Sequence, residues 1–409
     1  MIRLLHSQRR FSMIRTLSAR KECDQKTNMT KTEPHRESEF DLIIRAGRVV
    51  DPSGGFDRTG AVAIRDDRIV EVGAAIVGSA KESYEFSDAV LLPGLVDLHA
   101  HPDNSGSVFG VEPDEHFLKR GTTTVMSQGD CGADNCAKYV EQTIESSATQ
   151  VRLAINISRI GETTPAASCA NLDDVDVGAC VSAVERFPDK IWGIAVNVSK
   201  NTCEQTDPRE VLRRGLLAAT ESNRPILYGM RPPQEWPFEE QMKLLRPGDV
   251  VTYCFRREPH CIVENARVHP AIREARKLGI LFDVGHGMGS FDFIVAEAAI
   301  ADGFPPDTIS TDLHSHHQGQ KPVHDLPLTM SKLRAAGMSE AEVFAAVTCR
   351  SAKILGLNDE IGTLSAGSCA DLTVLRWNPD FQTLVDVNQN VRRGGSWKPL
   401  LTVRGGIVA

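Results

Sequence analysis

The sequence lacks three features that would each point to a particular class of protein. No stretch reaches the roughly 18 uninterrupted apolar residues that a membrane-spanning helix needs. Lys and Arg number 46 against 54 Asp and Glu, so the chain has no basic surplus for binding nucleic acid. The ten cysteines form no CxxC pair. We therefore expect a soluble protein that binds neither membrane nor nucleic acid, with cysteines that are mostly buried and reduced.

The first 40 residues differ in composition from the rest of the chain. Residues 1–21 are rich in arginine and serine, and no acidic residue precedes Glu22. This composition is typical of a mitochondrial transit peptide. The alternatives are a disordered extension, or a later start at Met13 or Met29. We expect residues 1–40 to be disordered and the protein to be cytoplasmic, or located in the mitochondrial matrix if this segment is a transit peptide.

Eight apolar runs, rich in Val, Ile and Leu, alternate with helix-like segments through the middle of the chain. The runs show little polar alternation, as expected for strands buried on both faces. This order predicts an α/β fold with a (β/α)₈ TIM barrel over residues 93–358. An open doubly wound sheet is the alternative, but such a fold is expected to have a glycine-rich phosphate-binding loop after its first strand. The runs cover residues 94–99, 122–127, 151–157, 191–198, 225–229, 249–255, 280–284 and 308–312.

Short strand-like segments flank the predicted barrel. They are separated by Gly, Asp and Pro turns in residues 41–92, and they return in residues 359–409. Each region is too short to bury a core alone. We therefore expect the two regions to pack together as one small β-sandwich domain beside the barrel.

Two histidines end the first predicted barrel strand, in the segment GLVDLHAHPDN. His99 and His101 are two residues apart, so their imidazoles point to the same side of a strand. The carboxyl ends of barrel strands form the mouth where active sites of TIM barrels lie. The pair therefore predicts a metal site, and the alternative is a pair of surface histidines.

An aspartate ends the eighth predicted strand, in the segment TISTDLHSHH. In a closed barrel this strand lies beside the first, so Asp312 can reach the same ion as His99 and His101. It is also a candidate for the catalytic base. The alternative is a helix cap, a position that Asp often takes.

Several segments together resemble metal-dependent amidohydrolases, above all the dihydroorotase-like amidohydrolase/deacetylase branch, with D-aminoacylases nearby. They are PGLVDLHAHPD, RGTTTV, FDVGHGMGSF, DTISTDLH and IGTLSAGSCADLTVL, and the resemblance runs from about Asp41 to the carboxyl terminus. It implies a (β/α)₈ barrel flanked by a β-sandwich, and metal-assisted hydrolysis. The family's paired histidines correspond to His99 and His101, and its strand-eight acid corresponds to Asp312.

The sequence departs from this family at the ligands of a second metal ion. Binuclear members carry a carboxylated lysine at the end of strand four, where this chain has Ala195 and Asn197. Strands five and six of those members end in histidines, where this chain has Tyr228 and Tyr253. We therefore expect a single divalent metal ion, with Zn²⁺ as the expected ion, or no metal at all.

Other residues at predicted strand ends are further candidates for the site. Cys131 resembles the cysteine ligand of D-aminoacylases, but the other nine cysteines suggest that cysteine here is usually a core residue. His286 ends strand seven, where it can bind substrate, complete the coordination or bond to a nearby loop. Arginines at the barrel mouth would hold a carboxylate by paired hydrogen bonds. Those near strand ends are Arg159, Arg231, Arg256 and Arg257.

Together these features predict a homo-oligomeric hydrolase that cleaves a C–N bond (amide or cyclic amide) or an ester bond in a small, anionic substrate. A mononuclear zinc deaminase is one alternative, although such enzymes usually keep the strand-five histidine. A non-catalytic scaffold protein with the amidohydrolase fold is the other, since the second-metal ligands are missing. The predicted metal ligands are His99, His101 and Asp312, the last also catalytic, and the predicted substrate-binding residues are His286, Arg231, Tyr228 and Tyr253.

Overall fold

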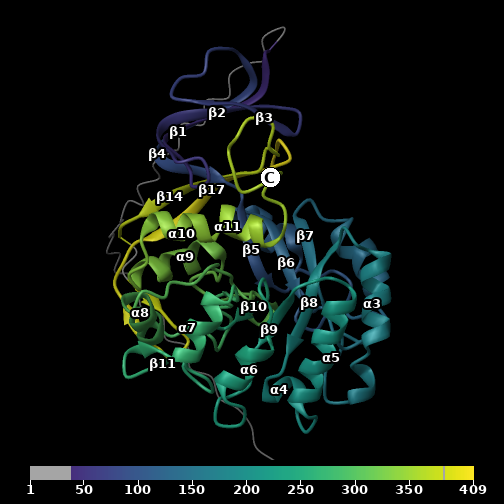
Figure 1. The fold of residues 1–409 in the computed structure, drawn as a ribbon. Coiled ribbons are helices and arrows are strands. Elements are labelled where there is room, and N and C mark those ends of the chain that lie inside the picture. Colours follow the sequence, from purple (N-terminus) through teal and green to yellow (C-terminus); the bar gives the residue numbers. More distant parts are fainter. Residues whose placement is uncertain (1–37, 381–382) are drawn as a thin grey trace, which may run out of the picture.

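The computed structural model describes residues 38–380 and 383–409 (Figure 1). Most of the predicted extension, residues 1–40, lies outside the described residues, and so does the predicted transit peptide. Within the described part of the chain, no helix has the length and apolar character needed to cross a membrane.

Seven parallel strands form the wall of the barrel, and their residues are almost all buried. Neighbours in the chain are neighbours in the sheet, because each crossover returns over a helical connection on the outside. The curled parallel sheet and its outer helices confirm the predicted fold class (Figure 1). In order the strands are β5 (Leu95–Ala100), β6 (Thr122–Gln128), β7 (Gln150–Asn156), β8 (Ile191–Asn197), β9 (Ile226–Gly229), β10 (Val250–Thr252) and β13 (Leu281–Phe282).

The eighth predicted strand, residues 308–312, is not a regular strand in the structure. Thr308 makes an isolated parallel bridge with Asp283, and Gly287 N donates to Thr311 O at 2.9 Å. On its other side Asp312 N donates to His99 O at 2.7 Å. The segment therefore lies between β13 and β5, as the last strand of a closed barrel should. Its ladder is irregular because Asp312 has a φ of +48°, which is incompatible with extended backbone.

Helices cover the outside of the barrel, and many begin with a side-chain cap. Asp207, Asp292 and Asp325 each accept a hydrogen bond from a backbone N–H in the first turn of the helix that follows. The helices are α1 (Pro113–His116), α2 (Cys136–Tyr139), α3 (Val177–Arg186), α4 (Lys200–Cys203), α5 (Pro208–Glu221), α6 (Phe238–Leu244), α7 (Pro270–Lys277), α8 (Phe293–Ala301), α9 (Leu326–Ala335), α10 (Glu340–Ala346) and α11 (Cys349–Ile354), with short turns η1 (Leu118–Arg120), η2 (Val140–Ile144), η3 (Leu172–Asp174) and η4 (Ser315–His317).

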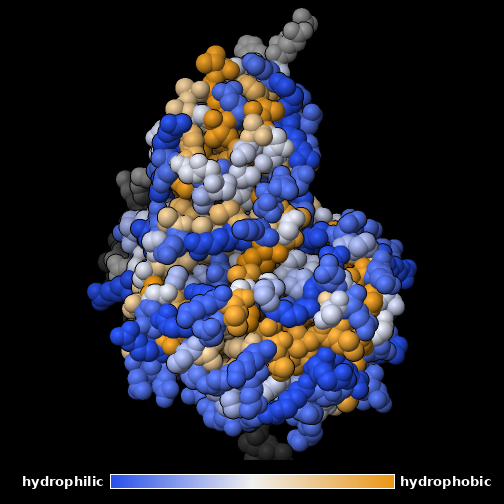
Figure 2. Space-filling model, in the orientation of Figure 1, coloured by the Kyte–Doolittle hydropathy of each residue, from blue (hydrophilic) through white to orange (hydrophobic). Residues whose placement is uncertain are grey.

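The strands from the two ends of the chain pair in one seven-stranded sheet beside the barrel. The two halves meet where β4 pairs antiparallel with β14, with Leu91 opposite Val374. Figure 2 shows that this part is narrower than the barrel and projects from it. The strands are β1 (Phe40–Asp51), β2 (Phe56–Arg65), β3 (Arg68–Gly73), β4 (Ala80–Pro93), β14 (Leu372–Asn378), β17 (Ser396–Arg404) and β18 (Ile407–Val408), and two small hairpins elsewhere use β11 (Val263–Glu264), β12 (Arg267–Val268), β15 (Leu384–Val385) and β16 (Val391–Arg392).

Candidate metal centre and active-site pocket

Three buried side chains converge at the carboxyl end of β5. Asp312 Oδ1 lies 3.4 Å from His99 Nε2 and 3.2 Å from His101 Nε2. The three atoms form a group of the size that can hold a metal ion. Two imidazole nitrogens and one carboxylate oxygen are a donor set that proteins use for zinc, with a position left for water. The residues present therefore fit a divalent cation.

The hydrogen bonds behind the two histidines fix which ring nitrogen faces Asp312. Thr252 donates its hydroxyl proton to Asp283 Oδ2 at 2.9 Å, so its oxygen accepts from His99 Nδ1 at 2.7 Å. His101 Nδ1 likewise donates to Asp130 Oδ1 at 2.9 Å. Both Nε2 atoms are thereby left to face the group. This arrangement is the one that metal-ligating histidines commonly show.

The electrostatics of the group are dominated by carboxylates. Burial alone would lower the pKa of His99, but Asp312 and Asp283 outweigh it and raise the pKa to about 9. For His101 burial is likewise outweighed, by Asp130 and Glu162, and its pKa lies well above the ordinary value. A divalent cation between the rings would take the place of the protons that these carboxylates attract.

Two glycines in the segment DVGHGMG make room for the group. A Cβ on Gly285 would lie 2.3 Å from Thr252 Oγ1, and one on Gly287 would lie 2.2 Å from Asp312 Oδ2. Both glycines have positive φ, +50° and +47°, which other residues rarely adopt. The motif therefore allows the loop after β13 to pack directly against the ligand residues.

The group opens onto a polar cavity of about 540 Å³ at the carboxyl ends of β5 to β10. Tyr253 lies in its wall with its hydroxyl 3.4 Å from His99 Nε2, and burial raises the pKa of this phenol well above the ordinary value. Asn197, where binuclear relatives carry their lysine, also lines it. His101, Glu162, Arg256 and Asp312 also line the cavity.

Of the four arginines expected at the mouth, one lines this cavity. Arg256 Nε donates to Ser290 Oγ at 3.0 Å, and its guanidinium lies 4.8 Å from the centre of the Tyr253 ring. No carboxylate of the described residues lies within 4.0 Å of it. The other three face acids instead, in the pairs Arg159–Asp134, Arg231–Glu235 and Arg257–Asp292.

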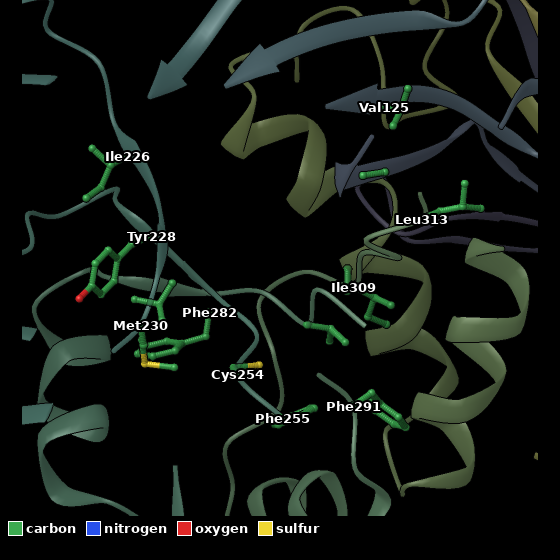
Figure 3. Close-up of a cluster of buried hydrophobic side chains, with 14 of the residues drawn as sticks. Val125, Ile226, Tyr228, Met230, Cys254, Phe255, Phe282, Phe291, Ile309 and Leu313 are labelled. Carbon is green, nitrogen blue, oxygen red and sulfur yellow. The ribbon is translucent and has the colours of Figure 1, made fainter. Parts of the chain in front are cut away.

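The structure does not bring three of the predicted substrate-binding residues to this cavity. Tyr228 points outward from β9, where its hydroxyl donates to Gln241 Oε1 at 2.8 Å among apolar side chains (Figure 3). Adjacent Leu227 faces the barrel interior instead, since neighbours on a strand face opposite sides. Arg231 is held by Glu235. His286 lines a second cavity, described below.

The sequence reasoning missed acidic residues that contact or support the histidines. Glu162, in the loop after β7, places Oε2 at 3.3 Å from His101 Nδ1. Burial raises its pKa to about 8. Asp97 accepts from Thr311 Oγ1 at 2.6 Å and so links β5 to the eighth segment. Asp130 lies two residues after the end of β6, so a search for acids near strand ends could have found it. Its neighbour Cys131 is buried and belongs to neither group of metal-binding geometry in the described residues.

Comparisons with known proteins agree with this geometry. The model of the Amidohydrolase family matches residues 252–394. A deacetylase of Enterococcus faecalis is 30% identical over 90% of this chain and 98% of its own length. A deacetylase of Agrobacterium fabrum is 33% identical over 80% of this chain and 81% of its own length.

Solved structures give the same assignment. A structure described as an adenine deaminase superposes with a TM-score of 0.83 at 29% identity, covering 91% of this chain and all of that one. A structure described as a dihydroorotase gives 0.81 at 29% identity, over 90% of this chain and 98% of that one. The similarity extends through both the barrel and the terminal sheet, and the chain belongs to the amidohydrolase family.

Proposed function

We propose that this chain is a metal-dependent hydrolase that cleaves a C–N or ester bond in a small substrate bearing a carboxylate. The observation that carries the proposal is the convergence of His99, His101 and Asp312 on a polar cavity at the barrel mouth. Its similarity to deacetylases and dihydroorotases supports it, since both kinds of enzyme act on C–N bonds. An N-acyl amino acid, a cyclic amide and an acylated hydroxy acid are the candidate substrates.

The proposed cofactor is one divalent ion, Zn²⁺, on His99, His101 and Asp312. When bound, such an ion polarises the scissile carbonyl and makes water more acidic. A second ion at the usual separation of roughly 3.5–4 Å would need an anionic group between the two. Ala195 has no such group and Asn197 is neutral. Tyr253 keeps its proton because burial raises its pKa.

The side chains divide the chemical work by position. Burial would raise the pKa of Asp312, but His99 and His101 outweigh it and hold the pKa well below the ordinary value. The ionised carboxylate can therefore accept a proton from the attacking water and return it to the leaving nitrogen or oxygen. The Tyr253 hydroxyl lies 3.4 Å from His99 Nε2, and from there it would donate a hydrogen bond to the oxygen on which negative charge develops.

Arg256 is the proposed anchor for the substrate carboxylate. Its guanidinium faces the cavity without an acidic partner among the described residues, and its contact with the Tyr253 ring restricts its position. A planar guanidinium binds a carboxylate through two parallel hydrogen bonds. The substrate carboxylate would thus pair with Arg256 and the scissile carbonyl would lie beside Asp312 in the same cavity.

The test is a hydrolysis assay of the metal-loaded protein on N-acetyl amino acids, cyclic amides and aryl esters, each beside an analogue whose carboxylate is replaced by carboxamide. We expect at least one carboxylate to be hydrolysed and its carboxamide to react much more slowly. Arg256→Met should remove this preference while leaving the metal content unchanged. Stoichiometric metal with no hydrolysis of any substrate would contradict the proposal.

Deamination is the second candidate, and the similarity to the structure described as an adenine deaminase favours it. Release of ammonia from adenine, measured on the same preparation, separates the two reactions. Loss of all metal on dialysis, together with no turnover, would instead support a non-catalytic scaffold.

A further inference from the structure

A second cavity, of about 510 Å³, lies on the far side of the loop that packs against Asp312. Gly287 contributes to its wall and also lies beside the Asp312 carboxylate, where an added Cβ would be 2.2 Å from Oδ2, so the two sites share this loop. The rest of the wall comes from α9, from the chain after the eighth segment and from residues 383–389 near the carboxyl terminus. Its basic and imidazole side chains are His286, His317, Lys321, His324 and Lys332.

Lys332 is a buried cation with most of its hydrogen-bonding capacity unused. It lies within α9 and is only 6% exposed. Its Nζ donates to His286 Nε2 at 2.8 Å, while His286 Nδ1 donates to the Gly287 carbonyl. An ammonium group has three N–H donors, and among the described residues this one has a single hydrogen-bond partner. No carboxylate oxygen of the described residues lies within 4.0 Å of Nζ, whereas buried charges in proteins are normally paired.

The acid that lines this cavity is already engaged by other donors. Asp386 Oδ2 accepts from Phe293 N at 2.7 Å and Asn390 Nδ2 at 2.8 Å. Its Oδ1 accepts from the backbone N–H groups of Asn388 and Asn390. These four hydrogen bonds tie the carboxylate to its own loop and to the first residue of α8. Asp386 therefore leaves the charge of Lys332 without a direct partner.

A histidine in the same wall supplies a second unused donor. The backbone N–H of His314 donates to His317 Nδ1, so the proton of this ring resides on Nε2. That Nε2 atom is buried and has no hydrogen-bond partner among the described residues. A buried donor without an acceptor is costly, and a ligand oxygen would remove the cost.

We propose that this cavity binds a small oxyanion, a carboxylate or a phosphate, through Lys332 Nζ and His317 Nε2. One oxygen of such a ligand would pair with the ammonium and another with the imidazole N–H. Exposed Lys321 at the rim adds positive charge to the approach. The site is separate from the proposed substrate pocket, so it stands whether or not the chain is a hydrolase.

The test measures thermal unfolding of the full chain while acetate or inorganic phosphate replaces chloride at constant ionic strength. It is done in an Arg256→Met background, which removes the other proposed anion contact. A ligand that binds the folded state raises Tm with concentration. We expect a rise for one of the two anions, its loss in Lys332→Met, and its retention in the matched control Lys353→Met, because Lys353 is exposed on α11 outside the cavity. The anion that raises Tm identifies the class of ligand.

An equal rise in the Lys332→Met protein, or no rise with either anion, would overturn the proposal. A second measurement needs no substitution at Lys332, in case that variant does not fold. The intact protein is treated with an amine-acylating reagent, and modification of each lysine is followed by mass spectrometry. The anion should slow modification of Lys332 several-fold while leaving that of Lys353 unchanged, and equal rates with and without the anion would count against the site.

Discussion

Two groups of buried histidines lie at the mouth of this barrel, and they differ in the charge of their neighbours. His99 and His101 face carboxylates, which outweigh burial and raise the pKa of both imidazoles. His286 and His324 lie near Lys332, and burial together with this cation lowers the pKa of both well below the ordinary value. The degree of burial is similar, so the sign of the neighbouring charge decides the direction.

The difference shows that the same residue type can prepare a site for opposite ligands. In the first group the acids exceed the fixed cations, and a metal cation would balance them. In the second group a cation lacks an acid, and an anion would balance it. The following experiments test whether the two groups behave as this contrast requires.

The largest expected effect is that of His99→Ala. The metal centre would keep two protein ligands, which seldom hold a catalytic ion. We expect both bound metal and hydrolysis to be lost, as measured by metal content per subunit after dialysis and by the rate on the best substrate. His116→Ala, a partly exposed histidine at the end of α1, is the matched control and should change neither. Full activity of His99→Ala would refute the metal mechanism, and two metal equivalents in the wild type would refute the single ion.

Asp312→Asn should reduce hydrolysis with less loss of metal. The amide oxygen can still face the ion, but the side chain no longer accepts a proton, and general acid–base catalysis contributes roughly 10²- to 10⁴-fold. The comparison to make is kcat per bound metal ion for the variant and the wild type. An unchanged kcat per ion would assign the proton transfer to another group, and Glu162, a carboxyl group that lines the cavity on the other side of His101, is the candidate.

Lys332→Met should stabilise the protein in the absence of an anion. Burial lowers the pKa of Lys332 from 10.5 to about 8, with His286, His324 and Asp386 facing it. At about 1.4 kcal/mol for each pH unit, this difference corresponds to about 3 kcal/mol. In the unfolded chain this lysine binds its proton more tightly than in the folded protein. The gain in free energy of unfolding from Lys332→Met is therefore full below pH 8 and disappears as pH rises towards 10.5. Urea unfolding at pH 7 and pH 10 measures it, and an advantage that does not shrink with pH would show that Lys332 is not the cause.

Asp130→Asn should have the smallest effect of the four. Asp130 contacts His101 at Nδ1, the ring nitrogen that faces away from Asp312, and loss of such a supporting acid typically costs about 10- to 100-fold in metal affinity or activity. A competition titration with a metal chelator gives the affinity. A loss as large as that of His99→Ala would mean that Asp130 binds the ion itself, in the second group that it forms with His101 and Glu162.

Much of the site was predictable because it lies where secondary structure ends. His99 and His101 follow a buried strand at a spacing of two, and Asp312 falls at the end of the last apolar run, so counting strands places them together. The backbone of the eighth segment was not predictable. Its irregular hydrogen bonding depends on a positive φ at Asp312 and on Gly285 and Gly287, which lie 27 and 25 residues earlier in the chain. Tyr228 was assigned to the wrong face of its strand. Side chains alternate between the two faces, so an error of one residue in where the strand begins reverses the face assigned to every side chain.

By itself the sequence determined the barrel, the terminal β region and the paired histidines, because hydrophobic periodicity and residue spacing are local properties of the chain. Only the tertiary structure decided which charges meet. It brought Glu162 and Asp130 to His101, turned Arg159 and Arg257 towards acids that are distant in the chain, and left Arg256 facing the pocket. It also placed Lys332, 46 residues after His286, against that imidazole, with no carboxylate oxygen of the described residues within 4.0 Å of Nζ. Pairing of this kind depends on how loops and helices pack across the barrel mouth, and no pattern along the chain records it.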